Sequence, residues 1–179
     1  MQSLRTRRSS KGFTLVEILI VVIILGILAA IVIPQFTNAS QDARKSSLTS
    51  QLQTIRSQTE LYKLQHLDEL PPSLIVDGTD QWAEMVKKTN EAHLDTATDM
   101  TTVRFGPYLQ AAPANPLNGL TKVGLVSTDV TLGGASGATD CGWVLNTDNG
   151  KVWATAKNPA VVYNEANSAD PANTAEASG

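Results

Sequence analysis

An apolar run near the N-terminus constrains the fold of this chain more than any other feature. Only two of the 21 residues at positions 13–33 are polar, Thr14 and Glu17. As an α-helix with a rise of about 1.5 Å per residue, the run would measure roughly 30 Å, the thickness of a bilayer core. Four basic residues and no acidic ones precede it, namely Arg5, Arg7, Arg8 and Lys11. Because such a basic flank stays in the cytoplasm, the sequence predicts one transmembrane helix with the C-terminal bulk of the chain outside the cytoplasm.

A carboxylate, Glu17, interrupts this apolar run. It costs about 2.5–3.5 kcal/mol on membrane-insertion scales, and ionisable residues inside membrane segments are usually functional. We find no folding role for it in the sequence, because a membrane helix forms better without it. Glu17 follows Phe13 by four residues, on the same helix face. If the chain is cut after Gly12, the new α-amine of Phe13, whose pKa is ordinarily near 8, could offset Glu17 within the chain or on a neighbouring subunit.

Two simpler interpretations of the N-terminus compete with this one. The first is a signal anchor that places Glu17 near the lipid headgroups. The second is a cleaved secretory signal, which would have an apolar core of roughly 7–15 residues and then a small-x-small cleavage site. The run at residues 13–33 is longer and continues into a helical pattern, which disfavours the secretory signal.

Residues 11–17, Lys-Gly-Phe-Thr-Leu-Val-Glu, resemble the cleavage and methylation signature of type IV pilins and of the pseudopilins of type II secretion. The resemblance implies that a prepilin peptidase cuts between Gly12 and Phe13 and methylates the amine of Phe13. It also implies that Glu17 guides subunit assembly. A proline-rich loop at residues 106–119 is similar to one in the major pseudopilins, so the chain most resembles a G-type pseudopilin.

Gly26 and Pro34 match positions where the long helix of this family loosens inside filaments. Glycine weakens a helix by up to about 1 kcal/mol relative to alanine, and proline removes a backbone donor. The segment between them is therefore expected to be helical in the isolated subunit and partly extended in a filament. Close helix packing in the membrane is an alternative role for Gly26, and a kink at Pro34 alone is the alternative for the segment.

Together these features predict an α+β, pilin-like fold. A long N-terminal helix, membrane-spanning in its first half, would pack against a small C-terminal antiparallel β-sheet. We divide the chain into a leader peptide at residues 1–12, a transmembrane half of the helix at 13–33, and an extracytoplasmic head at 34–163 that includes the outer half of the helix. Residues 164–179 have little apolar surface to bury and are predicted to be a disordered tail.

Helical periodicity locates two helices in the head. The long helix is expected to reach about Leu67, before a proline pair, and a short helix is expected to start at Thr79 or Asp80 and run through Lys88. The apolar stripe of the long helix is predicted to be Leu48, Leu52, Ile55, Thr59 and Tyr62, widened by Leu61 and Leu64.

Strand patterns follow toward the C-terminus. Residues 142–145 and 151–154 flank an Asn-Gly turn and predict a hairpin. Its Trp143 and Trp153 are candidates for the face that packs on the long helix. Further strands are expected at residues 122–127 and, more briefly, 130–132. The single cysteine, Cys141, allows no intramolecular disulfide and is expected to be a small buried residue in a strand, with intermolecular pairing as the alternative.

The net charge and the metal-binding side chains of the sequence indicate which classes of partner and ligand to expect. The formal net charge is −3, and it becomes −7 without the four cations of the leader. An acidic exterior argues against nucleic acid, because phosphate binding needs a basic face. We expect no cofactor. The resemblance implies that calcium could occupy a C-terminal loop near Asp129, Asp140 and Asp148, but these acids are scattered, which favours solvated turn residues.

The expected function is that of a non-enzymatic structural subunit of a type II secretion pseudopilus. The resemblance implies a homo-oligomeric filament, a prepilin peptidase, an inner-membrane assembly platform and sibling minor pseudopilins as partners. It places the protein in the bacterial inner membrane with its head in the periplasm. A type IV pilus subunit, for adhesion, motility or DNA uptake, is the main alternative. A membrane-tethered enzyme or binding module has little support, because one Cys and two His residues leave few nucleophile–base pairs.

Overall fold

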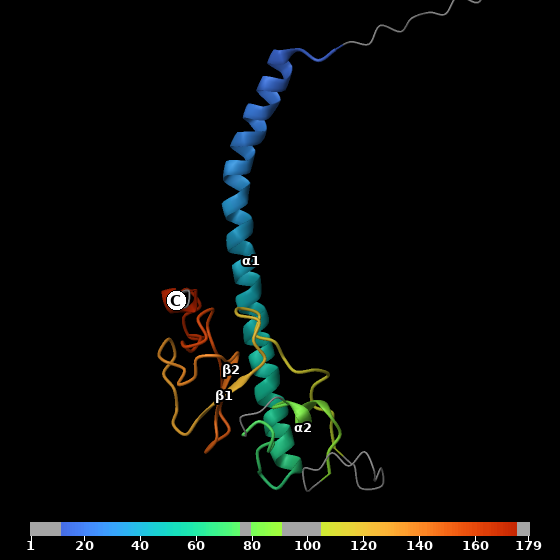
Figure 1. The fold of residues 1–179 in the computed structure, drawn as a ribbon, viewed down its shortest axis with the longest axis vertical. Coiled ribbons are helices and arrows are strands. Elements are labelled where there is room, and N and C mark those ends of the chain that lie inside the picture. Colours follow the sequence, from blue (N-terminus) through green and yellow to red (C-terminus); the bar gives the residue numbers. More distant parts are fainter. Residues whose placement is uncertain (1–11, 76–79, 91–104, 175–179) are drawn as a thin grey trace, which may run out of the picture. The chain divides into compact units, whose positions relative to one another are not determined.

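The computed structural model describes residues 12–75, 80–90 and 105–174. In chain order its elements are α1 (Leu15–Gln65), α2 (Ala83–Val86), β1 (Val123–Val126), β2 (Trp143–Asn146), β3 (Val152–Ala154) and the 3-10 helix η1 (Pro171–Asn173) (Figure 1). The chain forms two compact units, Met1–Asp42 and Ala43–Gly179, and α1 contributes to both. A long N-terminal helix and a small three-stranded sheet confirm the α+β, pilin-like class.

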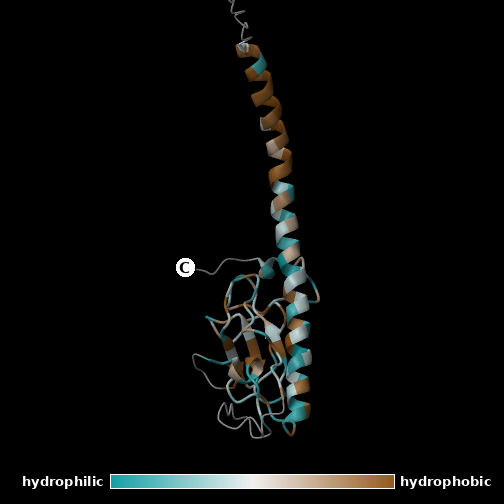
Figure 2. Cartoon of the chain, turned by 90° about the vertical axis from the view of Figure 1, so that its right-hand side faces the viewer, coloured by the Kyte–Doolittle hydropathy of each residue, from teal (hydrophilic) through white to brown (hydrophobic). Residues whose placement is uncertain are grey.

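The first unit contains the N-terminal part of α1, which is apolar and exposed. Its large side chains from Leu15 to Ile33 all face outward, each at least 40% exposed. Among the described helices, α1 is long and apolar enough to cross a membrane. Figure 2 shows the hydrophobic residues concentrated in this part of the helix, and hydrophilic ones replacing them further along. This exposed surface matches a lipid or protein environment rather than water.

The second unit is built on the later part of α1. The predicted stripe is confirmed, because the five buried residues of this helix are Leu48, Leu52, Ile55, Thr59 and Tyr62. By contrast, Leu61 and Leu64 are exposed and do not widen it. The stripe works because residues three and four apart share one helix face.

Helix α1 ends at Gln65, two residues before the predicted end. Leu67 and Asp68 adopt positive φ angles of 55° and 67°, which an α-helix cannot continue. The backbone N–H of Asp68 donates to the carbonyl of Lys63 at 2.8 Å, so the reversal satisfies one of the last helix carbonyls.

The three strands form a mixed sheet in the order β1-β2-β3. Strands β2 and β3 are antiparallel, as predicted for the hairpin. The prediction of an antiparallel sheet throughout is wrong, because β1 pairs in parallel with β2. The cause lies in the connection: residues 127–142 are long enough to carry the chain back to the starting edge, as a parallel pair requires.

Side-chain alternation sends the two hairpin tryptophans to opposite faces. Trp143 pairs with Ala154 and packs in the core cluster with the buried stripe of α1. The prediction that Trp153 shares this face is wrong. Trp153 pairs with Val144, and both lie in a second cluster with Cys141 and Val162. Successive residues of a strand point to opposite faces, so Val152 and Ala154 reach the α1 side and Trp153 cannot.

The segment around α2 closes one edge of this sheet. The side-chain amide of Gln81 donates to the carbonyl of Val123 and accepts from its N–H, both at 2.8 Å, like a neighbouring strand. Helix α2 is shorter than predicted. Its N-cap is Trp82 rather than Asp80, and the chain becomes extended at Lys87. The other predicted cap, Thr79, lies outside the described residues.

Two predictions for the C-terminal region are also corrected. Residues 130–132 form no strand, because the chain turns there and the N–H of Gly134 donates to the carbonyl of Thr131. Residues 164–174 form turns and the 3-10 helix η1 rather than the disordered tail that was predicted, although most of their side chains are exposed. The buried Asn173 side chain accepts from the N–H of Asn164 at 2.7 Å and donates to the carbonyls of Asn164 and Asn167, so polar contacts replace the missing apolar ones. The last five residues of the predicted tail lie outside the described ranges.

Candidate processing and assembly site

Two reciprocal hydrogen bonds cap the N-terminus of α1. The hydroxyl oxygen of Thr14 accepts from the backbone N–H of Glu17 at 3.2 Å. A carboxylate oxygen of Glu17 accepts from the backbone N–H of Thr14 at 3.4 Å. This is a capping box, in which two of the donors left free at a helix start are satisfied by side chains.

The capping box overturns our inference that Glu17 has no role in folding. The sequence signal was present, because Thr-x-x-Glu before an apolar run is the signature of a capping box. The sequence analysis interpreted Glu17 only as a partner for another subunit, because a carboxylate in a membrane segment is costly, and it left the capping box out. Thr14 is accordingly a functional residue that the sequence analysis left out.

Gly12 and Phe13 precede the helix and are exposed. A Cβ atom added at Gly12 would meet no atom of the chain within 4 Å. Nothing in this protein therefore requires a glycine there, and any requirement for a small residue would come from an enzyme that binds the junction. The structure thus presents an accessible peptide bond one residue before the capping box.

Gly26 and Pro34 lie inside α1, which continues through both. A Cβ atom at Gly26 would also meet nothing within 4 Å, so this chain alone gives the glycine no packing role. Proline at position 34 has no N–H to donate to the carbonyl one turn earlier, which leaves a gap in the helix hydrogen bonds. The structure does not bring these two residues together with Glu17; they lie further along the same helix.

Two residues with potential for other chemistry, Cys141 and His66, are both buried. The Cys141 thiol is buried and unpaired by disulfide, two residues before β2, and burial raises its pKa from 9.0 to about 11. Such a thiol is a weak nucleophile. His66 is buried, stacks on Tyr62 with ring centroids 3.9 Å apart, and contacts the hydroxyl of Thr89 at 3.0 Å. The other histidine, His93, lies outside the described residues.

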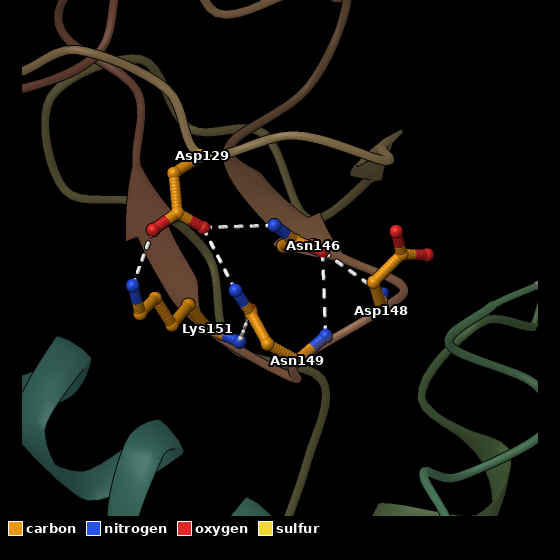
Figure 3. Close-up of polar contacts among 5 residues, drawn as sticks. All are labelled: Asp129, Asn146, Asp148, Asn149 and Lys151. Atoms are coloured by element: carbon orange, nitrogen blue, oxygen red, sulfur yellow. Dashed lines mark hydrogen bonds and ion pairs between the residues drawn. The ribbon is translucent and has the colours of Figure 1, made fainter.

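The three acids considered for calcium do not form a binding set. Within the described parts of the chain, no group of three or more His, Cys, Asp or Glu side chains lies close enough to hold a metal. Calcium takes six to eight oxygen ligands. The Asp129 carboxylate instead accepts hydrogen bonds from nitrogen atoms, those of Asn146, Asn149 and Lys151 (Figure 3). The residues present do not fit the ion.

Comparison with known proteins shows likenesses over part of the chain. Residues 7–33 match the model of the prokaryotic N-terminal methylation motif. A protein named type II secretion system core protein G from Pseudomonas aeruginosa is 43% identical over 58 residues, 32% of this chain and 41% of that protein. The protein of the same name from Dickeya chrysanthemi is 40% identical over 57 residues, 32% of this chain and 37% of that protein. No solved structure matches the chain significantly.

A longer match extends into the head. The core protein G of Vibrio cholerae is 28% identical over 115 residues, 63% of this chain and 69% of that protein. The chain spans about two fifths of the length of the first two curated relatives. Residues 7–33 thus carry the N-terminal methylation motif, and together with the capped apolar helix and the small sheet these likenesses show a chain that is similar to the core proteins G of type II secretion.

Proposed function

We propose that this protein is a structural subunit of a type II secretion pseudopilus, without catalysis of its own. The observation that carries the proposal is an exposed apolar helix that begins with a Glu17 capping box directly after an accessible Gly12–Phe13 bond. The name shared by the relatives favours secretion over a type IV pilus. The protein waits in the inner membrane as a single span, with its leader in the cytoplasm and its head in the periplasm.

Processing prepares the subunit for assembly. A prepilin peptidase cuts after Gly12 and methylates the new amine of Phe13. Removing the leader takes away four cations and leaves one amine at the membrane surface. Thr14 keeps its peptide N–H after the cut, so the capping box survives processing and continues to define the start of α1.

Assembly then packs the apolar parts of neighbouring helices α1 into a filament core. A helix that leaves the lipid loses no hydrophobic stabilisation if the core stays dry, because protein replaces lipid around it. The Glu17 carboxylate of one subunit pairs with the Phe13 amine of another. A buried ion pair adds little net stability, but one left incomplete costs about 3–5 kcal/mol, so the pair selects the axial register.

Gly26 and Pro34 give α1 a weak segment for this packing. Proline breaks the hydrogen-bond ladder and glycine lowers helix propensity, so the residues between them can extend at low cost when neighbours demand it. The inner-membrane platform supplies the force for extraction, and sibling minor pseudopilins share the filament. Nucleic acid is not a partner in this proposal, since the processed chain is acidic.

Mass spectrometry of protein extracted from membranes tests this proposal. The expected N-terminus is Phe13 with one added methyl group. Gly12→Val is expected to leave the uncut precursor in the membrane, because the peptidase needs a small residue at that position. Gly26→Ala, which changes a glycine away from the junction, is the matched control and is expected to be cut normally. Assembled material that still begins at Met1 would overturn the proposal.

A further inference from the structure

The carboxylate of Asp129 is surrounded by nitrogen donors from the β2–β3 turn. One carboxylate oxygen accepts from the side-chain amides of Asn146 and Asn149, each at 2.8 Å. The other oxygen pairs with the ammonium group of Lys151. Asp129 itself belongs to the connection between β1 and β2. These four residues, which we call the Asp129 clasp, therefore tie that connection to the following hairpin (Figure 3).

The amide oxygens of the clasp are also occupied. Oδ1 of Asn146 accepts from the backbone N–H of Asp148 at 2.8 Å and of Asn149 at 3.4 Å. Oδ1 of Asn149 accepts from the backbone N–H of Lys151 at 2.9 Å. Since these oxygens face backbone donors, the two side chains present their NH₂ groups to Asp129. Asn146 is only 2% exposed, so its orientation is fixed by contacts on both sides.

The nitrogen donors stabilise the Asp129 carboxylate and leave no place for a metal ion beside the Lys151 ammonium. A calcium ion would need the carboxylate and amide oxygens that Lys151 and the backbone N–H groups already use. The ammonium of Lys151 is a compact point charge with three donors, and it supplies the positive charge at that position. The carboxylate of Asp148, the acid of the β2–β3 turn, accepts instead from the hydroxyl of Thr147 at 3.4 Å.

We propose that the lysine ammonium of the Asp129 clasp replaces a metal ion, so that the β1–β2 connection is fastened to the hairpin and the head is stable without calcium. The ion pair also holds the pKa of Asp129 below its usual range, chiefly through the hydrogen bond from Lys151. The inference does not rest on the proposed function, because it concerns the stability of the isolated subunit.

Thermal unfolding of the processed full-length protein in detergent micelles tests the clasp. The melting temperature is measured with millimolar calcium and with EDTA. The two melting temperatures are expected to agree within about 1 °C. If calcium bound to the head, a free calcium concentration of about a hundred times its Kd would separate them by roughly 5–10 °C. A calcium-dependent rise beyond about 1 °C in the unmodified protein would overturn the proposal.

Variants then assign the effect to the ammonium group. Lys151→Met keeps the length of the side chain without its charge and is expected to lower the melting temperature by roughly 1–4 °C, because both partners of the pair are about half exposed. Lys151→Arg retains a cation and is expected to melt within about 1 °C of the unmodified protein. Asp148→Asn, in the same turn but outside the clasp, is the matched control and is expected to change nothing. An unchanged melting temperature for Lys151→Met would contradict the clasp, whatever the response to calcium.

A double substitution separates the pair from general effects on the turn. In Asp129→Asn combined with Lys151→Met, both charges are gone, while position 129 keeps an oxygen that can accept from Asn146 and Asn149. If the two charges act through each other, the loss of this double variant is expected to be smaller than the sum of the losses of the two single variants, Asp129→Asn and Lys151→Met. Melting-temperature losses that simply add would show that the residues act independently and would refute the pairing.

Discussion

Thr14 and Glu17 cap one another at the start of α1: each side-chain oxygen accepts the backbone N–H of the other residue, at 3.2 and 3.4 Å. Glu17 therefore has a partner in the isolated subunit before any neighbour arrives. Only one oxygen of the carboxylate accepts from Thr14, so the other is available to the Phe13 amine of another subunit in the proposed filament. Substitutions can separate these two interactions.

The cap predicts a local effect of Thr14→Ala. Loss of an N-cap hydroxyl costs about 0.5–2 kcal/mol, and here it frees the N–H of Glu17. Hydrogen exchange of that amide, measured by NMR in micelles, is expected to accelerate by roughly 2- to 30-fold, which is the same free energy expressed as an equilibrium. Thr14→Ser keeps the hydroxyl and is expected to exchange like the unmodified protein. Equal exchange in all three proteins would argue against the cap.

The buried stripe of α1 predicts a contrast between two leucines of the same helix. Leu52 is 1% exposed and Leu64 is 83% exposed. Leu52→Ala removes buried methyl groups and leaves a cavity, so it is expected to lower the free energy of unfolding by about 2–5 kcal/mol. Leu64→Ala is expected to change it by less than about 0.5 kcal/mol. Denaturant titration of the two variants checks this, and similar losses would mean that the stripe is misassigned.

The buried side chain of Asn173 predicts that this residue stabilises the head. Asn173→Ala leaves the backbone N–H of Asn164 and two backbone carbonyls without this side-chain partner. The expected loss is about 0.5–1.5 kcal/mol, the usual net contribution of a hydrogen bond, because Asn164 is half-buried and Asn167 is exposed. Thr174→Ala, next to it but exposed, is the control. If Asn173→Ala were as stable as the unmodified protein, the result would support the disordered tail that the sequence alone suggested.

Burial of Cys141 predicts a loss of stability at high pH. The pKa of its thiol is raised from 9.0 to about 11 in the folded state, because burial disfavours the thiolate. A raised folded pKa gives a contribution that is complete below pH 9.0 and is lost as the pH rises through about 11, since the unfolded chain ionises first. The loss is up to about 2–3 kcal/mol.

The test is to measure the melting temperature of the unmodified protein and of Cys141→Ala as a function of pH. Buried tyrosines also destabilise the fold at high pH, because their pKa values are raised as well, so the difference between the two proteins isolates the thiol. The curve of the unmodified protein is expected to fall more steeply between pH 9 and 11. Parallel curves over that range would show that the thiol does not contribute.

Periodic and local signals in the sequence were sufficient for part of this structure. The stripe from Leu48 to Tyr62 follows from helical spacing, and the hairpin follows from its Asn-Gly turn. Long-range relations were not available in the same way. The parallel pairing of β1 depends on the path of residues 127–142, and the packing of Asn173 depends on acceptors and donors in Asn164 and Asn167.

The functional residues show the same contrast between local and long-range relations. Glu17 stood out because a carboxylate in an apolar run is costly. The partner of Glu17 did not stand out, although Thr14 lies three residues away. Hydrogen bonds at a helix start are local and follow a known pattern, so this was an omission rather than a limit of the sequence. The nitrogen donors around Asp129, in contrast, come from a separate turn and needed the structure.

Filament yield from Glu17 variants tests the central claim most directly. Sheared filaments are quantified by immunoblot at equal total membrane protein. Glu17→Ala removes both cap and charge and buries a neighbour's Phe13 amine unpaired, at about 3–5 kcal/mol per subunit, so filaments are expected to be lost while cleavage proceeds. Glu17→Gln keeps the cap without the charge and is expected to give an intermediate yield, and Thr14→Ala, which keeps the charge, a higher one. Wild-type filament yield from Glu17→Ala would show that the charge pair does not drive assembly.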